Sequence, residues 1–134
     1  MNNGNYLKHC DIARIWFWKE TGVWDLLFKL SGSMTLGGSC NRYRRAITLF
    51  TKFTIKTRVI YWDDTAFYVE QTFVRDSDGF ICFIALIKQT VIGIKPEQII
   101  DNLGYEIEKP EILPELKLWI ESTSSSSERL RKKS

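Results

Sequence analysis

The segment from Asn5 to Lys19 constrains the fold of this chain most strongly, because it has the pattern of one unusually apolar helix. Its apolar side chains recur at helical spacing and then extend almost around the helix. They are Tyr6, Leu7, Cys10, Ile12, Ala13, Ile15, Trp16, Phe17 and Trp18. A helix that is apolar on nearly every side is expected to be wrapped by other elements.

The later sequence predicts an antiparallel sheet that could wrap this helix. Residues 53–59 alternate apolar and polar side chains, as a strand with one solvated face does. Asp63-Asp64-Thr65 separates them from residues 67–75, which predicts a hairpin, and the apolar centre of residues 80–92 predicts a strand buried on both faces. With a strand at 35–43, we expect an α+β fold in which the sheet curls around the helix.

The flanking segments predict shorter elements. Val23 to Leu30 is expected to be helical or irregular, and helices are expected to begin near Pro96 and after Leu113-Pro114. The end of the chain is rich in serine and basic residues, which predicts disorder. We therefore expect one domain over residues 1–118 and a disordered tail over 119–134.

Composition excludes several classes of protein. A length of 134 residues with 44% hydrophobic residues supports one core, and a net charge of +3 is too mild for nucleic-acid binding by itself. The three cysteines are widely spaced, which favours reduced thiols in an intracellular compartment. The longest apolar run, residues 80–87, is too short to span a membrane, and no secretory signal is visible at the start.

The polar entrance of the first helix is a candidate site. Asn2 and Asn3 can cap the helix, Gly4 allows close approach of a ligand, and the free N–H groups can polarise a carbonyl oxygen. The alternative is an ordinary N-cap.

Several motifs along the chain resemble one enzyme family. They are Asn2-Asn3-x-x-Tyr6-Leu7, Asp11-x-x-Arg14, Arg42-Tyr43-Arg44-Arg45, Tyr61-Trp62-Asp63-Asp64, Phe67-Tyr68-Val69-Glu70 and Asp78-Gly79-Phe80. Together they resemble the hotdog-fold acyl-CoA thioesterases of the 4-hydroxybenzoyl-CoA thioesterase type, and in particular an animal branch called thioesterase superfamily member six. The resemblance extends to about Leu118. It implies a long antiparallel sheet around a central helix, an acyl-CoA partner, and hydrolysis of the fatty acyl thioester at the helix start.

One departure from the family leaves the activity open. The family's catalytic Asp and His precede the position of Met1, so the resemblance implies that this carboxylate and the first strand lie outside the sequence. It also implies an apolar anchor before that position. The chain is then either part of an acyl-CoA thioesterase or a noncatalytic hotdog module that binds acyl groups or partner proteins.

The resemblance also implies the substrate contacts, namely Tyr6, Arg42, Tyr43, Arg44 and Arg45. Guanidinium groups match phosphate geometry, and Tyr43 could stack on adenine. Strand alternation predicts that Arg42 and Arg44 share one face and that Arg45 points to the other. A solvated strand end is the alternative.

The remaining polar residues of the first helix favour structural roles. His9 is expected to be partly exposed, and Asp11 is expected to pair with Arg14 within the helix or across a subunit interface. No glycine-rich phosphate loop, metal-ligand set or serine elbow is present in the sequence, so we expect no metal and no cofactor. The apolar strand at 80–87 suggests a homodimer or a dimer of dimers.

Overall fold

The computed structural model describes residues 3–104 and 106–132, apart from the side chain of Asn3. Four helices and four strands follow one another along this part of the chain. They are α1 (Asn3–Glu20), α2 (Val23–Lys29), β1 (Ser33–Tyr43), β2 (Phe53–Trp62), β3 (Ala66–Arg75), β4 (Ile81–Ile92), α3 (Pro96–Asp101) and α4 (Pro114–Arg131). Each strand expected from the sequence is present, with bounds shifted by a few residues.

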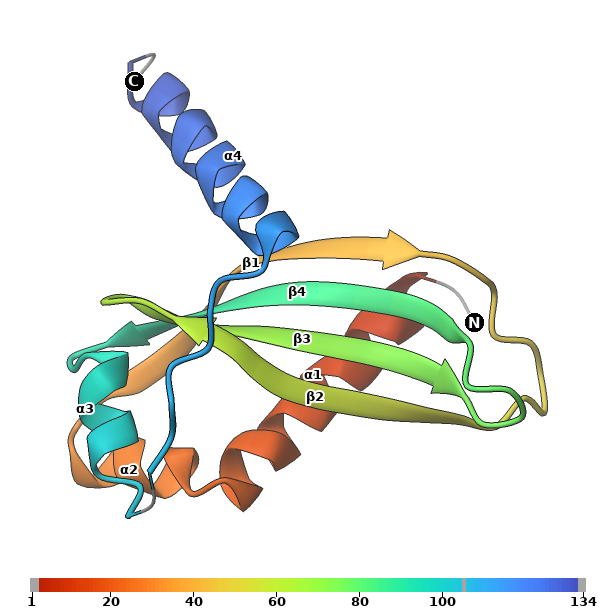
Figure 1. Cartoon of the computed structure of the whole chain (residues 1–134), viewed down its shortest axis with the longest axis horizontal. Helices are drawn as coiled ribbons and strands as arrows, with labels where there is room; N and C mark the ends of the chain where they lie inside the picture. Colours follow the sequence, from red (N-terminus) through yellow and green to blue (C-terminus); the bar gives the residue numbers. More distant parts are fainter. Residues whose placement is uncertain (1–2, 105, 133–134) are drawn as a thin grey trace.

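The four strands form one antiparallel sheet in the order β1-β4-β3-β2. Strands β2, β3 and β4 follow one another as hairpins, whereas β1 lies at the edge beside β4, and α1 crosses one face of the sheet (Figure 1). The α+β class and the curled antiparallel sheet confirm the expected fold. The pairing of β1 with β4 joins residues far apart in sequence, which local periodicity does not reveal.

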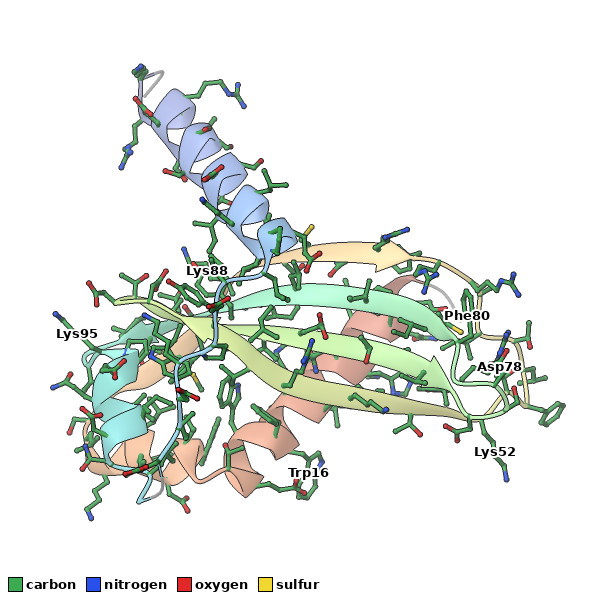
Figure 2. All side chains as sticks on the ribbon, in the orientation of Figure 1. Trp16, Lys52, Asp78, Phe80, Lys88 and Lys95 are labelled. Carbon is green, nitrogen blue, oxygen red and sulfur yellow. The ribbon has the colours of Figure 1, made fainter. Side chains whose placement is uncertain are left out.

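Helix α1 packs on the sheet through a narrow stripe of every fourth residue. Tyr6, Cys10, Arg14 and Trp18 are buried along it. The expectation of a fully wrapped helix is wrong, because the sheet covers one side only and exposed apolar residues line the other. They are Leu7, Ile12, Ile15 and Trp16, and Figure 2 shows Trp16 on the side away from the sheet.

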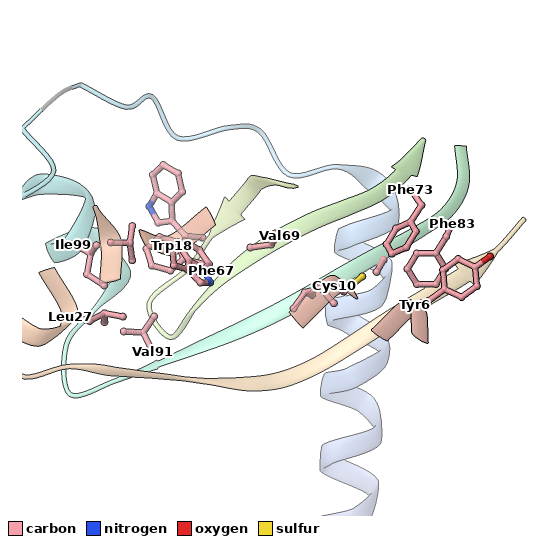
Figure 3. Packing of buried hydrophobic residues seen from close by; sticks show 14 of the residues in the cluster. Tyr6, Cys10, Trp18, Leu27, Phe67, Val69, Phe73, Phe83, Val91 and Ile99 are labelled. Carbon is pink, nitrogen blue, oxygen red and sulfur yellow. The ribbon is translucent and has the colours of Figure 1, made fainter. Parts of the chain in front are cut away.

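The core has two parts on opposite faces of the sheet. The larger part lies under α1 and runs from Tyr6 and Phe83 at one end to Trp18 and Phe67 near the other (Figure 3). The smaller part lies under the first turns of α4 and includes Tyr68 and Leu86. Strand β4 is therefore buried on both faces within one chain, and its apolar residues no longer give a reason to expect a dimer.

The expected disorder after residue 119 is wrong for residues 119–131, which belong to α4. Leu116 is fully buried against the sheet, and Trp119 packs edge-on against Tyr68. Pro114 in the first turn and the basic residues Arg129 and Arg131 in the last turn favour a helix. The second half of α4 projects away from the sheet (Figure 1). Among the described residues, no helix is long and apolar enough to cross a membrane.

Candidate functional site

The sequence-predicted site residues gather at one end of the sheet, where α1 begins and β1 ends. We call this region the α1-start end and define it by residues 3–10, 42–53 and 75–83. Tyr6 holds it together, because its hydroxyl accepts a hydrogen bond from the Ile47 N–H (3.1 Å) and donates to the Arg45 carbonyl (3.4 Å). Its ring packs on Tyr43 and Phe83, with centroids 5.4 and 4.9 Å away.

Tyr6 is buried in the core, whereas the resemblance implied that it contacts the substrate. It is 3% exposed, so its ring belongs to the core and its hydroxyl is already engaged by the loop after β1. Tyr6 connects the helix start to the arginine-bearing segment. Tyr43 is exposed and remains available to a ligand.

The helix start keeps its positive pole. Gly4 is exposed in the first turn of α1, and the first turn contains no acidic residue. The free N–H groups of such a turn attract anions and polarised carbonyl oxygens. Asn2 and the side chain of Asn3 lie outside the described part of the chain, so capping of α1 by these two residues stays a prediction.

Three guanidinium groups surround the ring of Phe80 at this end. Arg44, Arg45 and Arg75 lie 4.7, 4.8 and 5.4 Å from the ring centroid, and Figure 2 shows Phe80 and Asp78 at this end of the sheet. The backbone N–H groups of Arg44 and Arg45 both donate to the Cys82 carbonyl, at 2.8 and 3.1 Å.

This geometry corrects the expected alternation of the arginines. Strand β1 ends at Tyr43, so Arg44 and Arg45 leave the strand and converge on one ring, while Arg42 remains on the strand. Strand parity no longer applies to the last two residues of the motif.

The arginines at Phe80 differ in their partners. The Arg75 guanidinium donates two hydrogen bonds to the Asp78 carboxylate, and the Phe80 N–H donates a third. These hydrogen bonds lower the pKa of the Asp78 carboxyl to about 2. Within the described part of the chain, no carboxylate pairs with Arg44 or Arg45. These two guanidinium groups are therefore the ones that can receive an anionic ligand.

A shallow groove of about 380 Å³ adjoins the helix start. Asn5 forms one side of it, and residues 47–51 with Phe53 form the other. The groove joins the positive helix pole to the loop that follows the arginines.

Sequence reasoning missed a polar cluster in the core. Arg14 is 6% exposed and donates to Gln71 Oε1 (2.8 Å), Gln89 Oε1 (3.2 Å) and Asp11 Oδ1 (2.5 Å). Gln71 in turn donates to the Cys10 carbonyl at 3.0 Å. Two features of the sequence indicate such a cluster. They are the glutamines inside two apolar strands and the arginine in line with the buried residues of α1.

The other candidate groups on α1 have structural environments. The expected Asp11–Arg14 pair is present within the helix. His9 is exposed and packs edge-on against Phe53 and Phe73. Burial raises the pKa of the Cys10 thiol to about 11, which makes it a poor nucleophile at neutral pH.

A second cavity, of about 180 Å³, lies at the opposite end of α1. Its lining is apolar and includes Trp18, Trp62, Phe67, Ile100 and Leu103. Thr21 adds one hydroxyl to a lining that is otherwise made by apolar and aromatic side chains, so the cavity is suited to an apolar ligand.

Comparisons with known proteins agree with this architecture. A family model for the thioesterase-like superfamily matches residues 1–120. Protein THEM6 of Xenopus laevis is 38% identical over 135 residues, and the match covers all of this chain but only 65% of that relative, so the chain spans about two thirds of the relative's length.

Solved structures show the same fold. The probable thioesterase YbaW from Escherichia coli has a TM-score of 0.62 at 20% identity, with 69% of each chain covered. The Staphylococcus aureus protein SAV2348, solved in complex with CoA, has a TM-score of 0.60 at 16% identity, with 82% of this chain and 84% of that chain covered. The expected resemblance is confirmed: the chain belongs to the thioesterase-like superfamily, with a hotdog fold and relatives among the animal THEM6 proteins.

Proposed function

We propose that this chain binds acyl-CoA at the α1-start end and forms part of a thioesterase that hydrolyses the fatty acyl thioester. The observation that carries the proposal is the connection made by Tyr6, which brings the positive start of α1 beside Arg44 and Arg45. Neither guanidinium group pairs with a carboxylate of the described residues, although that of Arg44 donates to the Ile81 carbonyl at 3.0 Å. A thioester carbonyl and the phosphates of coenzyme A need these two kinds of partner. The CoA complex of the structural relative SAV2348 supports the same ligand class.

Each group has a definite role in this proposal. The free N–H groups of the first turn of α1, next to Gly4, stabilise the oxyanion that develops on the thioester carbonyl, and Asn2 and Asn3 add side-chain donors.

Arg44 and Arg45 hold phosphate groups, and the exposed Tyr43 stacks on the adenine. Arg42, which stays on β1, contributes only a distant charge. Asp11 already pairs with Arg14 and, eight residues after Asn3, lies about 12 Å along the helix from its start, too far to activate water there.

Coenzyme A binding tests the proposal directly. Titration calorimetry of the chain with coenzyme A should show binding that weakens about three- to tenfold in Arg44→Gln and in Arg45→Gln, as charge-assisted contacts to phosphate are lost. Arg58→Gln is the matched control, because Arg58 is an exposed strand arginine that pairs with Glu70 on β3. Equal affinity in all four proteins would refute the phosphate site.

Hydrolysis is tested at Gly4. Alanine at this helical position should stabilise α1 slightly but hinder approach of the carbonyl to the helix start. A thiol-release assay on decanoyl-CoA and palmitoyl-CoA, run on a form of the protein that includes the carboxylate implied by the family resemblance, should therefore show slower turnover in Gly4→Ala at unchanged or raised melting temperature. An unchanged rate would contradict the placement of the carbonyl there.

The noncatalytic alternative has its own supporting observation, the apolar cavity of about 180 Å³ near Trp18 and Trp62. A module that only binds acyl groups should take up a fluorescent fatty acid in this cavity and release no thiol from acyl-CoA. Ile100→Trp, which fills the cavity, should then weaken fatty acid uptake without changing coenzyme A binding.

We also propose that the protein is a homodimer or a dimer of dimers. Strand β1 is an edge of the described sheet, and the exposed side chains Leu36, Ile12 and Ile15 lie on β1 and α1. An unprotected edge next to exposed apolar side chains favours pairing with a second copy. Light scattering after size exclusion tests this, and a monomer at micromolar concentration would refute it.

A further inference from the structure

The two most exposed large apolar side chains among the described residues are neighbours in one loop. Leu49 is 83% exposed and Phe50 is 94% exposed, in the segment between β1 and β2. The protein gains almost no burial from either side chain in this position. Two adjacent apolar groups held in water indicate a partner outside the chain.

The backbone of the loop holds them there at a cost. Phe50 has a φ of +67°, a left-handed conformation that a bulky residue rarely adopts. Flanking threonines close the turn, since the Thr51 N–H donates to the Thr48 carbonyl (3.1 Å) and their hydroxyls lie 2.8 Å apart. Strain at a residue that makes almost no internal contact is a sign of a functional position.

Positive charge flanks the exposed pair. Lys52 follows it and Arg44 and Arg45 precede it, all three exposed, and Figure 2 shows Lys52 at the same end of the sheet as Phe80. In the described residues Lys52 has no carboxylate partner.

Two acidic residues lie at this end, and one of them is in an ion pair. The nearby Asp76 accepts a hydrogen bond from Thr54 (2.7 Å), and Asp78 pairs with Arg75. Asp76 keeps its negative charge, but Arg44, Arg45 and Lys52 outnumber it, so the net charge around Leu49 and Phe50 is positive.

We propose that the loop of residues 44–52 docks on an anionic lipid bilayer, with Leu49 and Phe50 entering the headgroup region and Lys52 facing lipid phosphates. An exposed loop with two adjacent apolar side chains and a basic surround matches a lipid surface, which is apolar beneath a negative layer. A protein partner would need a pocket for both side chains, and nothing in the charge pattern selects one. The proposal does not depend on thioester hydrolysis.

Vesicle co-sedimentation of the full chain tests the proposal. Vesicles of phosphatidylcholine with 30% phosphatidylserine, a composition chosen for strong negative charge, should bind the protein about tenfold more tightly than pure phosphatidylcholine vesicles, and salt should weaken the binding. The double variant Leu49→Ser/Phe50→Ser should lose about tenfold or more of the binding, and Lys52→Gln should lose about threefold to tenfold. Phe28→Ser is the matched control, because Phe28 on α2 is 79% exposed and far along the chain from this basic loop, and it should change binding by less than about twofold.

The outcomes separate lipid from protein partners. Absence of vesicle binding by the unmodified protein overturns the proposal, as does unchanged binding in the double variant. If the unmodified protein does not bind vesicles and the double variant changes the oligomeric state in light scattering, the loop contacts a second copy of the chain instead. Because the side chains of Leu49 and Phe50 are almost fully exposed, the variants should fold. The comparison of vesicles with and without phosphatidylserine uses the unmodified protein and needs no variant. Leu49 and Phe50 also line the groove beside the helix start, so the coenzyme A affinity of the double variant is measured as well. Lost vesicle binding at unchanged coenzyme A affinity separates the lipid surface from the coenzyme A site.

Discussion

Arg14 on α1 and Gln71 on β3 are joined by a hydrogen bond of 2.8 Å in the interior, where the two residues are 6% and 0% exposed. Gln89 on β4 accepts from the same guanidinium group and also from the Trp18 indole, at 3.4 Å. A buried charge is tolerated only when its donors are satisfied, so this cluster dictates where α1 lies on the sheet.

We predict that Gln71→Met destabilises the protein by about 2–4 kcal/mol, because it removes one acceptor from a buried guanidinium group. Arg14→Met should have a similar cost, since it leaves the Gln71 carbonyl unpaired and the Gln89 carbonyl with only the long contact from the Trp18 indole. The double variant should be less destabilised than the sum of the two, as the cluster is then replaced by apolar contacts. Urea unfolding measures all three, with Arg58→Met as an exposed control expected to change stability by less than about 0.5 kcal/mol. Additive effects would show that the two residues act independently.

Adjacent glycines in β1 provide a second, internally controlled test. A Cβ at Gly37 would lie 2.4 Å from Thr90 Oγ1, whereas one at Gly38 would meet Trp119 at an ordinary 3.7 Å. Gly37→Ala should therefore destabilise the protein by about 1–3 kcal/mol, and Gly38→Ala should change stability little. Thr90→Ala should rescue Gly37→Ala in thermal unfolding. Equal effects of the two alanines would contradict the close packing of β1 on β4.

The sequence predicts the elements of the fold better than their partners. Period-two alternation in residues 53–59 and the turn residues after Asp63 are local signals, and both strands form as expected. The position of β1 beside β4 depends on pairing between residues that are 40 (Tyr43 with Phe83) to 59 (Ser33 with Ile92) positions apart, for which no local pattern exists. The serines of α4 have weak helix propensity, but Leu116 and Trp119 anchor the helix to the sheet, and tertiary packing overrides propensity there.

The candidate site shows the same division. The helix start and the arginine cluster were visible as residue types, and the resemblance linked them. The convergence of Arg44 and Arg45 on Phe80 requires β1 to end at Tyr43, which strand periodicity does not specify. The role of Tyr6 as a link also depends on a loop hydrogen bond that has no sequence signature.

The environment of the Asp63 carboxyl group leads us to expect a loss of stability in acid. Burial raises the pKa of its carboxyl, but hydrogen bonds from the Thr65 and Ala66 N–H groups, the Thr65 hydroxyl and the Tyr68 hydroxyl outweigh burial and lower the pKa below 3.8. A lowered folded-state pKa means that this stabilisation is complete above the unfolded pKa and is lost as the pH falls through the folded one.

We therefore expect the difference in stability between the unmodified protein and Asp63→Asn to be constant near neutral pH and to shrink as the pH falls below about 4. Urea unfolding at a series of pH values measures it. Taking the difference removes the contribution of Asp78, whose pKa is also lowered. A difference that stays constant throughout the acid range in which the protein remains folded would show that the hairpin carboxylate makes no net contribution.

Phe50 gives the last prediction, which separates folding from function at one residue. Asparagine tolerates a φ of +67° better than phenylalanine does, and the side chain of Phe50 makes almost no internal contact. Phe50→Asn should therefore raise the free energy of unfolding by about 0.5–1 kcal/mol, measured by urea unfolding. Phe28→Asn, which replaces another highly exposed phenylalanine in helix α2, should give no such gain, because Phe28 has no positive φ for asparagine to relieve. The same Phe50→Asn protein should bind anionic vesicles more weakly. A variant that is more stable but docks less well would show that the strain is kept for the lipid contact, whereas a loss of stability would show that Phe50 supports the fold and that its conformation carries no strain.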